Sequence, residues 1–161
     1  MTRSLGPALS PELLARLSQS DLPAVLGRGV PLVTVDADGR PHPMLCSYLE
    51  LLAAEPAVIR LVIGASGRTG RNLDERGACT LLFVEADRTV YVKCRTAGRR
   101  FTAGELARFD LAVEDVLEDS PTDWETGIRI TGGITFAPAP ALDAPWSKAT
   151  LAALRAERPS S

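Results

Sequence analysis

The chain has 161 residues and a net charge of -2 at pH 7, with 24% of its residues charged. This length suits one domain with a substantial core, so we expect a single domain over residues 1–161. The balanced charge excludes the strongly basic surface that nucleic acid or an acidic membrane would require, and we expect neither as a partner.

A first helix is predicted within about residues 10–20, because Ser10 can cap it and Pro11 suits its first position. The pattern then changes to β-rich runs separated by turn residues. In chain order these runs are "VPLVTVD", "HPMLCSYLEL", "AVIRLVIG", "CTLLFVEA", "TVYVKCR", "RFDLAVEDVLED" and "GIRITGGITFAP". A closing helix is predicted over about residues 146–157, in "WSKATLAALRAE".

These runs predict about six to seven strands, most of them joined by hairpins such as the Asp38-Gly39 turn. A meander of this kind must close on itself to bury its apolar faces, which favours a barrel. Several strands are apolar on both faces, which suits a barrel that packs part of its outer face against a second subunit. We therefore predict a mainly β (α+β) barrel of mostly antiparallel strands with short flanking helices.

Cysteine and histidine usage limits the chemistry that the chain can perform. Cys46, Cys79 and Cys94 are widely spaced in apolar runs, which is typical of reduced, buried thiols in a cytoplasmic protein. His42 is the single histidine, and its two proline neighbours favour a surface position over proton transfer. One histidine cannot build a multi-histidine site, so we expect no metal. We recognise no secretory signal, and no run reaches the ~20 apolar residues that span a bilayer.

The stretch "IGASGRTGRNLDER", residues 63–76, lies between two apolar runs and combines glycines with arginines and hydroxyl side chains. It lacks the lysine of a P-loop, and its glycine spacing is not that of a dinucleotide fingerprint. A strand, a glycine loop and a short helix remain, with Arg68 and Arg71 three residues apart and with Ser66 and Thr69 as further donors. Two interpretations stay open on this pattern: a phosphate-binding loop and a polar surface loop.

The order of motifs from about Val30 to Arg95 resembles the FMN-binding split-barrel superfamily, the pyridoxamine 5'-phosphate oxidase-like proteins. The resemblance is carried by "PLVTVDADGRPHPMLCSY" and "LVIGASGRTGRNLDERGACTLLFVEADRTVYVK". It implies a split β-barrel, FMN as the cofactor, and a homodimer with FMN in the crevice between subunits.

The resemblance also implies the cofactor-binding residues. "GRTGRNL" matches the turn that binds the FMN phosphate, which assigns Arg68 and Thr69 to the phosphate and leaves Arg71 and Asn72 close by. The family commonly has Arg-Lys where this chain has Arg68-Thr69, so one cation is missing here. The segments matching those beside the flavin ring and ribityl chain are Leu45, Cys46 and Ser47, and Ile63, Gly64 and Ala65.

Two of the candidate residues have plain structural alternatives. Cys46 is also expected as a small core residue, because it lies in an apolar run. Lys93 alternates out of the apolar face of "TVYVKCR" and is either solvated or close to the flavin phosphate or a substrate anion.

The function implied by the resemblance is that of a flavin-dependent oxidoreductase with an unidentified substrate and with NAD(P)H as a candidate hydride donor. FMN would carry the redox chemistry, and no side chain stands out as a catalytic acid or base. Two alternatives remain. One is a flavin-binding protein of stress or storage type without turnover. The other is a split barrel that has lost FMN and acts as a dimeric interaction module.

Overall fold

The structure, a computed structural model, describes residues 1–157. The last residues of the expected domain, 158–161, lie outside the described residues. The strands are β1 (Thr2–Gly6), β2 (Gly29–Val35), β3 (Pro41–Ser47), β4 (Leu51–Glu55), β5 (Val58–Gly64), β6 (Ala78–Glu85), β7 (Arg88–Thr96), β8 (Phe101–Ala103) and β9 (Leu106–Asp119). The helices are α1 (Pro11–Leu17), α2 (Leu22–Val25), α3 (Arg68–Arg76) and α4 (Pro145–Arg155), with single 3-10 turns η1 (Tyr48–Glu50) and η2 (Asp123–Glu125).

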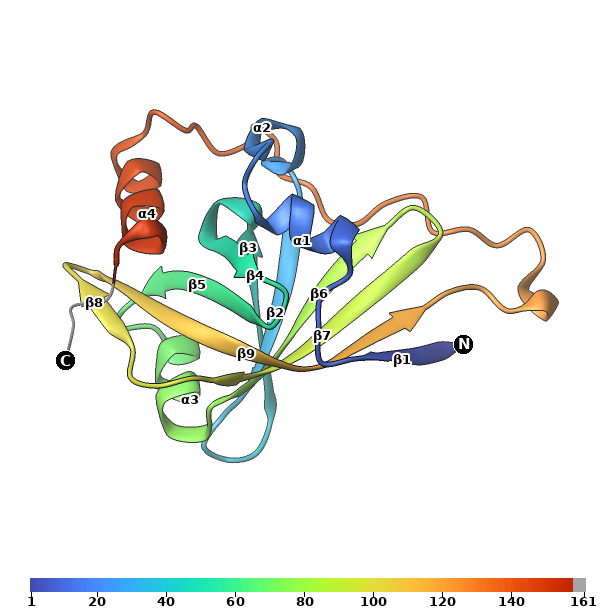
Figure 1. The fold of residues 1–161 in the computed structure, drawn as a ribbon, viewed down its shortest axis with the longest axis horizontal. Coiled ribbons are helices and arrows are strands. Elements are labelled where there is room, and N and C mark those ends of the chain that lie inside the picture. The colour runs from blue at the N-terminus through green and yellow to red at the C-terminus, as the bar shows by residue number, and fades with distance from the viewer. Residues whose placement is uncertain (158–161) are drawn as a thin grey trace.

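The strands form one antiparallel sheet in the order β3-β2-β6-β7-β9-β5-β4 (Figure 1). The long strand β9 joins its two parts, because it pairs with β8 and β7 along one edge and with β5 and β1 along the other. Within the described residues no β3–β4 ladder closes the sheet, and η1 carries the chain from β3 to β4. This confirms the predicted mostly antiparallel split barrel.

The core lies inside this barrel, as the alternation of apolar residues predicts. In β6, Cys79, Leu81 and Phe83 point inward, while Leu82 and Val84 lie on the outer face. Helices α1 and α2 cover one end of the barrel, and α3 lies at the other end, beside the β2–β3 hairpin (Figure 1).

Helix α4 is held by arginines that bind its last carbonyls, which lack partners within the helix. Arg108 is 1% exposed and donates from Nη1 to the carbonyls of Ala153 (3.1 Å) and Ala156 (2.6 Å). Arg60 donates to the carbonyl of Leu154 (2.9 Å).

Helix α1 ends at Leu17, three residues before the expected limit, and α4 spans 145–155 rather than 146–157.

The strand expected in "GIRITGGITFAP" is absent, and this prediction is wrong. Residues 127–138 contain only an isolated bridge between Thr135 and Arg28. Gly132 and Gly133 interrupt the alternation, and Ile128 and Ile134 are 66% and 51% exposed, so no apolar face binds this segment to the sheet. It crosses the ends of β2 and β6 as a strap instead. We call residues 131–135 of this segment the strap.

Two other elements also differ from the prediction. The expected strand over residues 42–51 is split by η1, where Ser47 and Glu50 form a capping box. Strand β1 was not predicted, because Thr2–Gly6 is almost wholly exposed and has no apolar alternation. Only its pairing with β9 defines it as a strand.

Candidate functional site

Helix α3 begins directly after the barrel strand β5. Gly67 is its N-cap residue, in an extended conformation with φ -71° and ψ 161°, and glycine has no side chain with which to cap the helix. The Gly67 amide donates to the carbonyl of Gly64 (3.4 Å). The first amides of an α-helix have no partners within the helix, and the positive end of the helix dipole lies there. The start of α3 can therefore accept an anion.

A cavity of about 450 Å³ lies between α3 and the turn that joins β2 to β3. Arg68 and Arg71 line it from α3, together with the carboxylate of Glu75. Asp36 and Asp38 line it from the turn. The lining thus carries more carboxylates than cations. An anion bound in this cavity must be held by the two arginines against these carboxylates.

Asn72 fixes the position of α3 against β2. It is 3% exposed, and its Nδ2 donates to Thr34 Oγ1 (3.0 Å) and to Asp36 Oδ1 (3.0 Å). Both amide hydrogens of Asn72 are therefore in use. In this geometry Asn72 has no hydrogen to donate to a phosphate, and it acts as a positioning residue for α3.

Asp36 is the residue that the sequence analysis missed. Besides accepting from Asn72, it lies 3.8 Å from Arg68 Nη1 and 4.0 Å from His42 Nδ1. The Asp38-Gly39 turn was visible in the sequence and predicts the hairpin. It does not predict which helix the hairpin meets, and that contact is what makes Asp36 part of the site.

The second predicted group lies at the other end of β2 and β3. Leu45 pairs with Pro31, four residues along β2 from Val35, or about 13 Å at ~3.3 Å per residue. The Cys46 thiol donates to the carbonyl of Val30 (3.2 Å), and burial raises its pKa well above the ordinary value, so it stays protonated as a core residue. Ser47 is buried and its hydroxyl donates to Glu50 (3.1 Å). Of this group, only the Leu45 side chain is exposed.

The remaining candidates divide between these places. Strand β5 ends with Ile63 and Gly64, and Ala65 follows it in the loop before α3, where its carbonyl accepts from Arg100 (3.1 Å). Ser66 is exposed on the loop and Thr69 is buried in α3. Lys93 is exposed on the outer face of the sheet, and in the strand register it lies opposite Thr80 of β6 and Asp115 of β9.

The structure therefore brings together Arg68, Arg71 and Asn72 at one cavity. It does not bring Leu45, Cys46, Ser47 or Lys93 into the lining of that cavity. A ligand with its phosphate at α3 would have to extend along β3 to reach Leu45.

Between residues 1 and 157, no group of three or more histidine, cysteine, aspartate or glutamate side chains is placed to hold a metal ion. None of the helices in this part of the chain is both long and apolar enough to cross a membrane.

No protein-family model matches the sequence, and no curated protein matches it. Solved structures do match. A protein from Lactobacillus delbrueckii, described as a "putative pyridoxamine 5'-phosphate oxidase", is 16% identical, with a TM-score of 0.56 over 71% of this chain and 98% of that chain. An FMN-binding protein from Syntrophomonas wolfei is 15% identical, with a TM-score of 0.53 over 69% of this chain and 89% of that chain. The HupZ protein from Group A Streptococcus is 14% identical, with a TM-score of 0.52 over 67% of this chain and 91% of that chain.

These likenesses establish the fold. The chain has a split-barrel fold, which it shares with these solved structures, and helix α3 begins at one end of the barrel.

Proposed function

We propose that the chain is an FMN-binding protein, and that it acts as a flavin-dependent oxidoreductase. The observation that supports this most is the start of α3, where free helix amides lie beside Arg68 and Arg71. The fold is shared with an FMN-binding protein, and FMN carries a phosphate of the kind that such a helix start accepts.

The donor set at α3 fits a phosphate, with one condition. Arg68 must turn from Asp36 towards the ligand, and this is open to it because the two groups are 3.8 Å apart and Arg68 is 64% exposed. Arg71 borders the same cavity. The exposed side of β3, which ends near Leu45, offers a path for the rest of an elongated ligand.

When bound, FMN would supply hydride transfer at its ring, with NAD(P)H as the candidate donor. The chain's own contribution is to hold the phosphate through Arg68 and the α3 amides and to keep α3 in place through Asn72. The Cys46 thiol is buried and protonated, so it serves packing.

We further propose that the chain is a homodimer that packs through the outer face of its sheet. Leu45 lies opposite Pro31, and Leu82, Tyr91 and Leu117 continue the same row across β6, β7 and β9. This row is apolar although it points away from the core, and Lys93 lies one row away on the same face. Apolar rows of this kind mark interfaces. The three cysteines are free and buried, which supports a reducing, cytoplasmic setting.

One observation favours a second candidate. Asp36, Asp38 and Glu75 surround the two arginines, and the lysine common in the family is missing at Thr69. A split barrel that no longer binds FMN, and that acts as a dimeric interaction module, would tolerate this charge balance.

The visible spectrum of the purified protein, with and without added FMN, tests the proposal. A flavin spectrum that NAD(P)H bleaches supports the oxidoreductase. A stable flavin spectrum without bleaching indicates a flavin binder without turnover, and a colourless protein that does not bind added FMN indicates the interaction module.

A further inference from the structure

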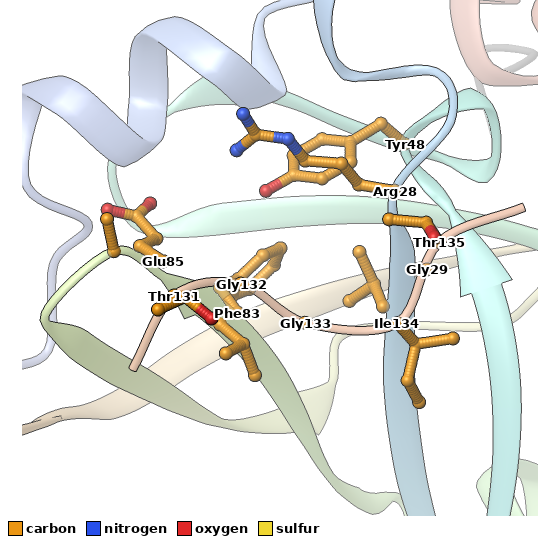
Figure 2. A pocket seen from close by; sticks show the side chains of 13 residues that line it. Arg28, Gly29, Tyr48, Phe83, Glu85, Thr131, Gly132, Gly133, Ile134 and Thr135 are labelled. Atoms are coloured by element: carbon orange, nitrogen blue, oxygen red, sulfur yellow. The ribbon is translucent and has the colours of Figure 1, made fainter. Parts of the chain in front are cut away.

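A second cavity, of about 290 Å³, lies at the opposite end of β2 and β6 from α3 (Figure 2). Its walls come from four separate parts of the chain: residues 28–30, Tyr48, residues 83–86 and the strap. The cavity therefore exists only in the folded chain, and none of the motifs in the sequence analysis refers to it.

The strap is a fixed wall of this cavity. The Ile134 carbonyl accepts from the Gly29 amide (2.8 Å), and just beyond the strap the Phe136 amide donates to the Gly27 carbonyl (2.7 Å). A Cβ on Gly133 would lie 2.9 Å from Val84 Cβ, so the main chain of the strap rests directly on β6 and only glycine fits there. The cavity is thus shaped by hydrogen bonds and close packing on both sides.

The hydroxyl of Tyr48 has no partner within the described residues. The side chain is 4% exposed, and its ring packs at a tilt against Phe83, with 5.9 Å between centroids. The hydroxyl points into the cavity (Figure 2). Burial raises the pKa of the Tyr48 phenol, so it stays protonated and can donate a hydrogen bond. The hydroxyl borders the open cavity, so its hydrogen is available to a ligand that enters there.

Arg28 supplies a cation beside this hydroxyl. Its guanidinium lies towards the hydroxyl end of the Tyr48 ring in Figure 2, and burial raises the pKa of the Tyr48 phenol while the charges of Arg16 and Arg28 act to lower it. Arg28 forms no ion pair with any residue of the described chain. Its amide donates to the Val25 carbonyl (3.0 Å), which fixes the start of the side chain.

The carboxylate in the wall does not favour a cationic ligand. Both oxygens of Glu85 are engaged, Oε1 with Arg16 and Oε2 with Arg88. The polar groups that remain for a ligand are the Arg28 guanidinium and the Tyr48 hydroxyl, and Phe83 and Val30 supply an apolar part of the cavity wall. A guanidinium and a phenol together match the two oxygens of a carboxylate.

We infer that this cavity is a second ligand site, which binds a small organic carboxylate with an apolar body through Arg28 and Tyr48. The apolar body would lie on Phe83, and the carboxylate would accept from both donors. Thr34 and Asp36, which contact Asn72 of α3, lie at the far end of β2, so this site is separate from the proposed phosphate site.

Benzoate is a suitable probe, with neutral benzamide as the matched control ligand. Titration calorimetry should show one benzoate site in the protein as purified and much weaker binding of benzamide. Tyr48→Phe keeps the ring on Phe83 and removes only the hydroxyl, so benzoate should bind about tenfold or more weakly. Arg28→Gln should have an effect of similar size. Arg40→Gln, at an 84% exposed arginine on the β2–β3 turn, should change nothing.

Several results would overturn the inference. These are no benzoate binding to the wild type, equal binding of benzamide, or unchanged benzoate affinity in folded Tyr48→Phe and Arg28→Gln proteins. If inorganic phosphate competes as strongly as benzoate, the cavity binds anions in general and does not select organic carboxylates. FMN affinity should not respond to either variant, and a loss of FMN binding would show that the two sites are one.

Discussion

Asn72 donates a 3.0 Å hydrogen bond to the carboxylate of Asp36, and the same carboxylate lies 3.8 Å from Arg68. Asp36 therefore both anchors helix α3 and competes for the cation that a phosphate would use. Stability of the α3 end of the barrel and affinity for an anion depend on the same side chain.

Asn72→Ala should destabilise the protein by about 2–4 kcal/mol, because it removes one neutral hydrogen bond and one to a charged group in a buried position. Urea unfolding followed by circular dichroism measures this change. Arg71→Ala is the matched control on the exposed side of α3 and should stay within about 0.5 kcal/mol of wild type. Equal stability of the two variants would show that Asn72 does not hold the helix.

Arg68→Ala should weaken FMN about tenfold to hundredfold, because a charge-assisted hydrogen bond to the phosphate is lost. Fluorescence titration with FMN and with riboflavin measures the effect. Riboflavin lacks the phosphate, so it should bind wild type more weakly than FMN and should respond little to Arg68→Ala. Arg71→Ala should cost less. A wild type that prefers riboflavin, or an Arg68→Ala protein with normal FMN affinity, would exclude the α3 start as the phosphate site.

Asp36→Asn should tighten FMN binding, by about 0.5–1 kcal/mol, since the carboxylate that competes for Arg68 is removed. The new amide oxygen can still accept from Asn72, so α3 should stay in place. Asp38→Asn is the control, because its 61% exposed side chain pairs with Arg40 and should affect FMN less. Weaker FMN binding in Asp36→Asn would mean that Asp36 supports the ligand.

Leu82→Glu should convert the proposed dimer to a monomer, because a charge in the apolar outer row would be buried without a partner at the interface. Light scattering at micromolar concentration measures the mass. Leu142→Glu, at a leucine outside the sheet, should leave the dimer intact. A monomeric wild type, or a Leu82→Glu protein that remains dimeric, would contradict this interface.

Glu50→Gln should stabilise the protein at neutral pH but not in acid. Burial raises the pKa of Glu50 above its ordinary value of 4.5, although hydrogen bonds from Ser47 oppose this. When a carboxyl has a higher pKa in the folded state than in the unfolded state, its ionisation is less favourable in the folded protein. The free energy of unfolding therefore falls as the pH rises from the unfolded-state pKa through the folded-state pKa. Glutamine can still accept from the Ser47 amide and hydroxyl without ionising.

The urea midpoints of wild type and Glu50→Gln, measured from about pH 4 to about pH 7, test the direction of this pH dependence. The advantage of Glu50→Gln should grow as the pH rises and vanish towards the acid end. An advantage that is the same at every pH would show that the ionisation of Glu50 is not its cause.

Local patterns were enough to predict several elements. The Asp38-Gly39 turn predicts the β2–β3 hairpin, and Gly39 has the positive φ of 84° that such a turn needs. The alternation in residues 78–85 predicts β6 with its inner and outer faces. Ser10 and Pro11 predict the start of α1, where Ser10 accepts from the Leu13 amide (3.2 Å). In each case the deciding atoms are a few residues apart in the chain.

Distant contacts decided the rest. Residues 127–138 have part of the alternation of a strand, but Gly132 and Gly133 interrupt it, and they form an irregular segment with a single bridge. Thr2–Gly6 has no strand pattern and becomes β1 because β9 provides an edge. Asn72 was a candidate cofactor-binding residue by its place beside the phosphate turn, yet its amide hydrogens bind residues 36 and 38 positions away in the chain.

By itself, then, the sequence determined the barrel class, most of its strands and the short helix with its arginines, since periodicity and turn chemistry act over a few residues. Only the tertiary structure placed Asp36 against Arg68, and Arg28 and Tyr48 at one cavity with the strap. These groups meet because the sheet joins strands that are far apart in the chain. The spacing of residue types along the sequence does not show which side chains this strand pairing brings into contact.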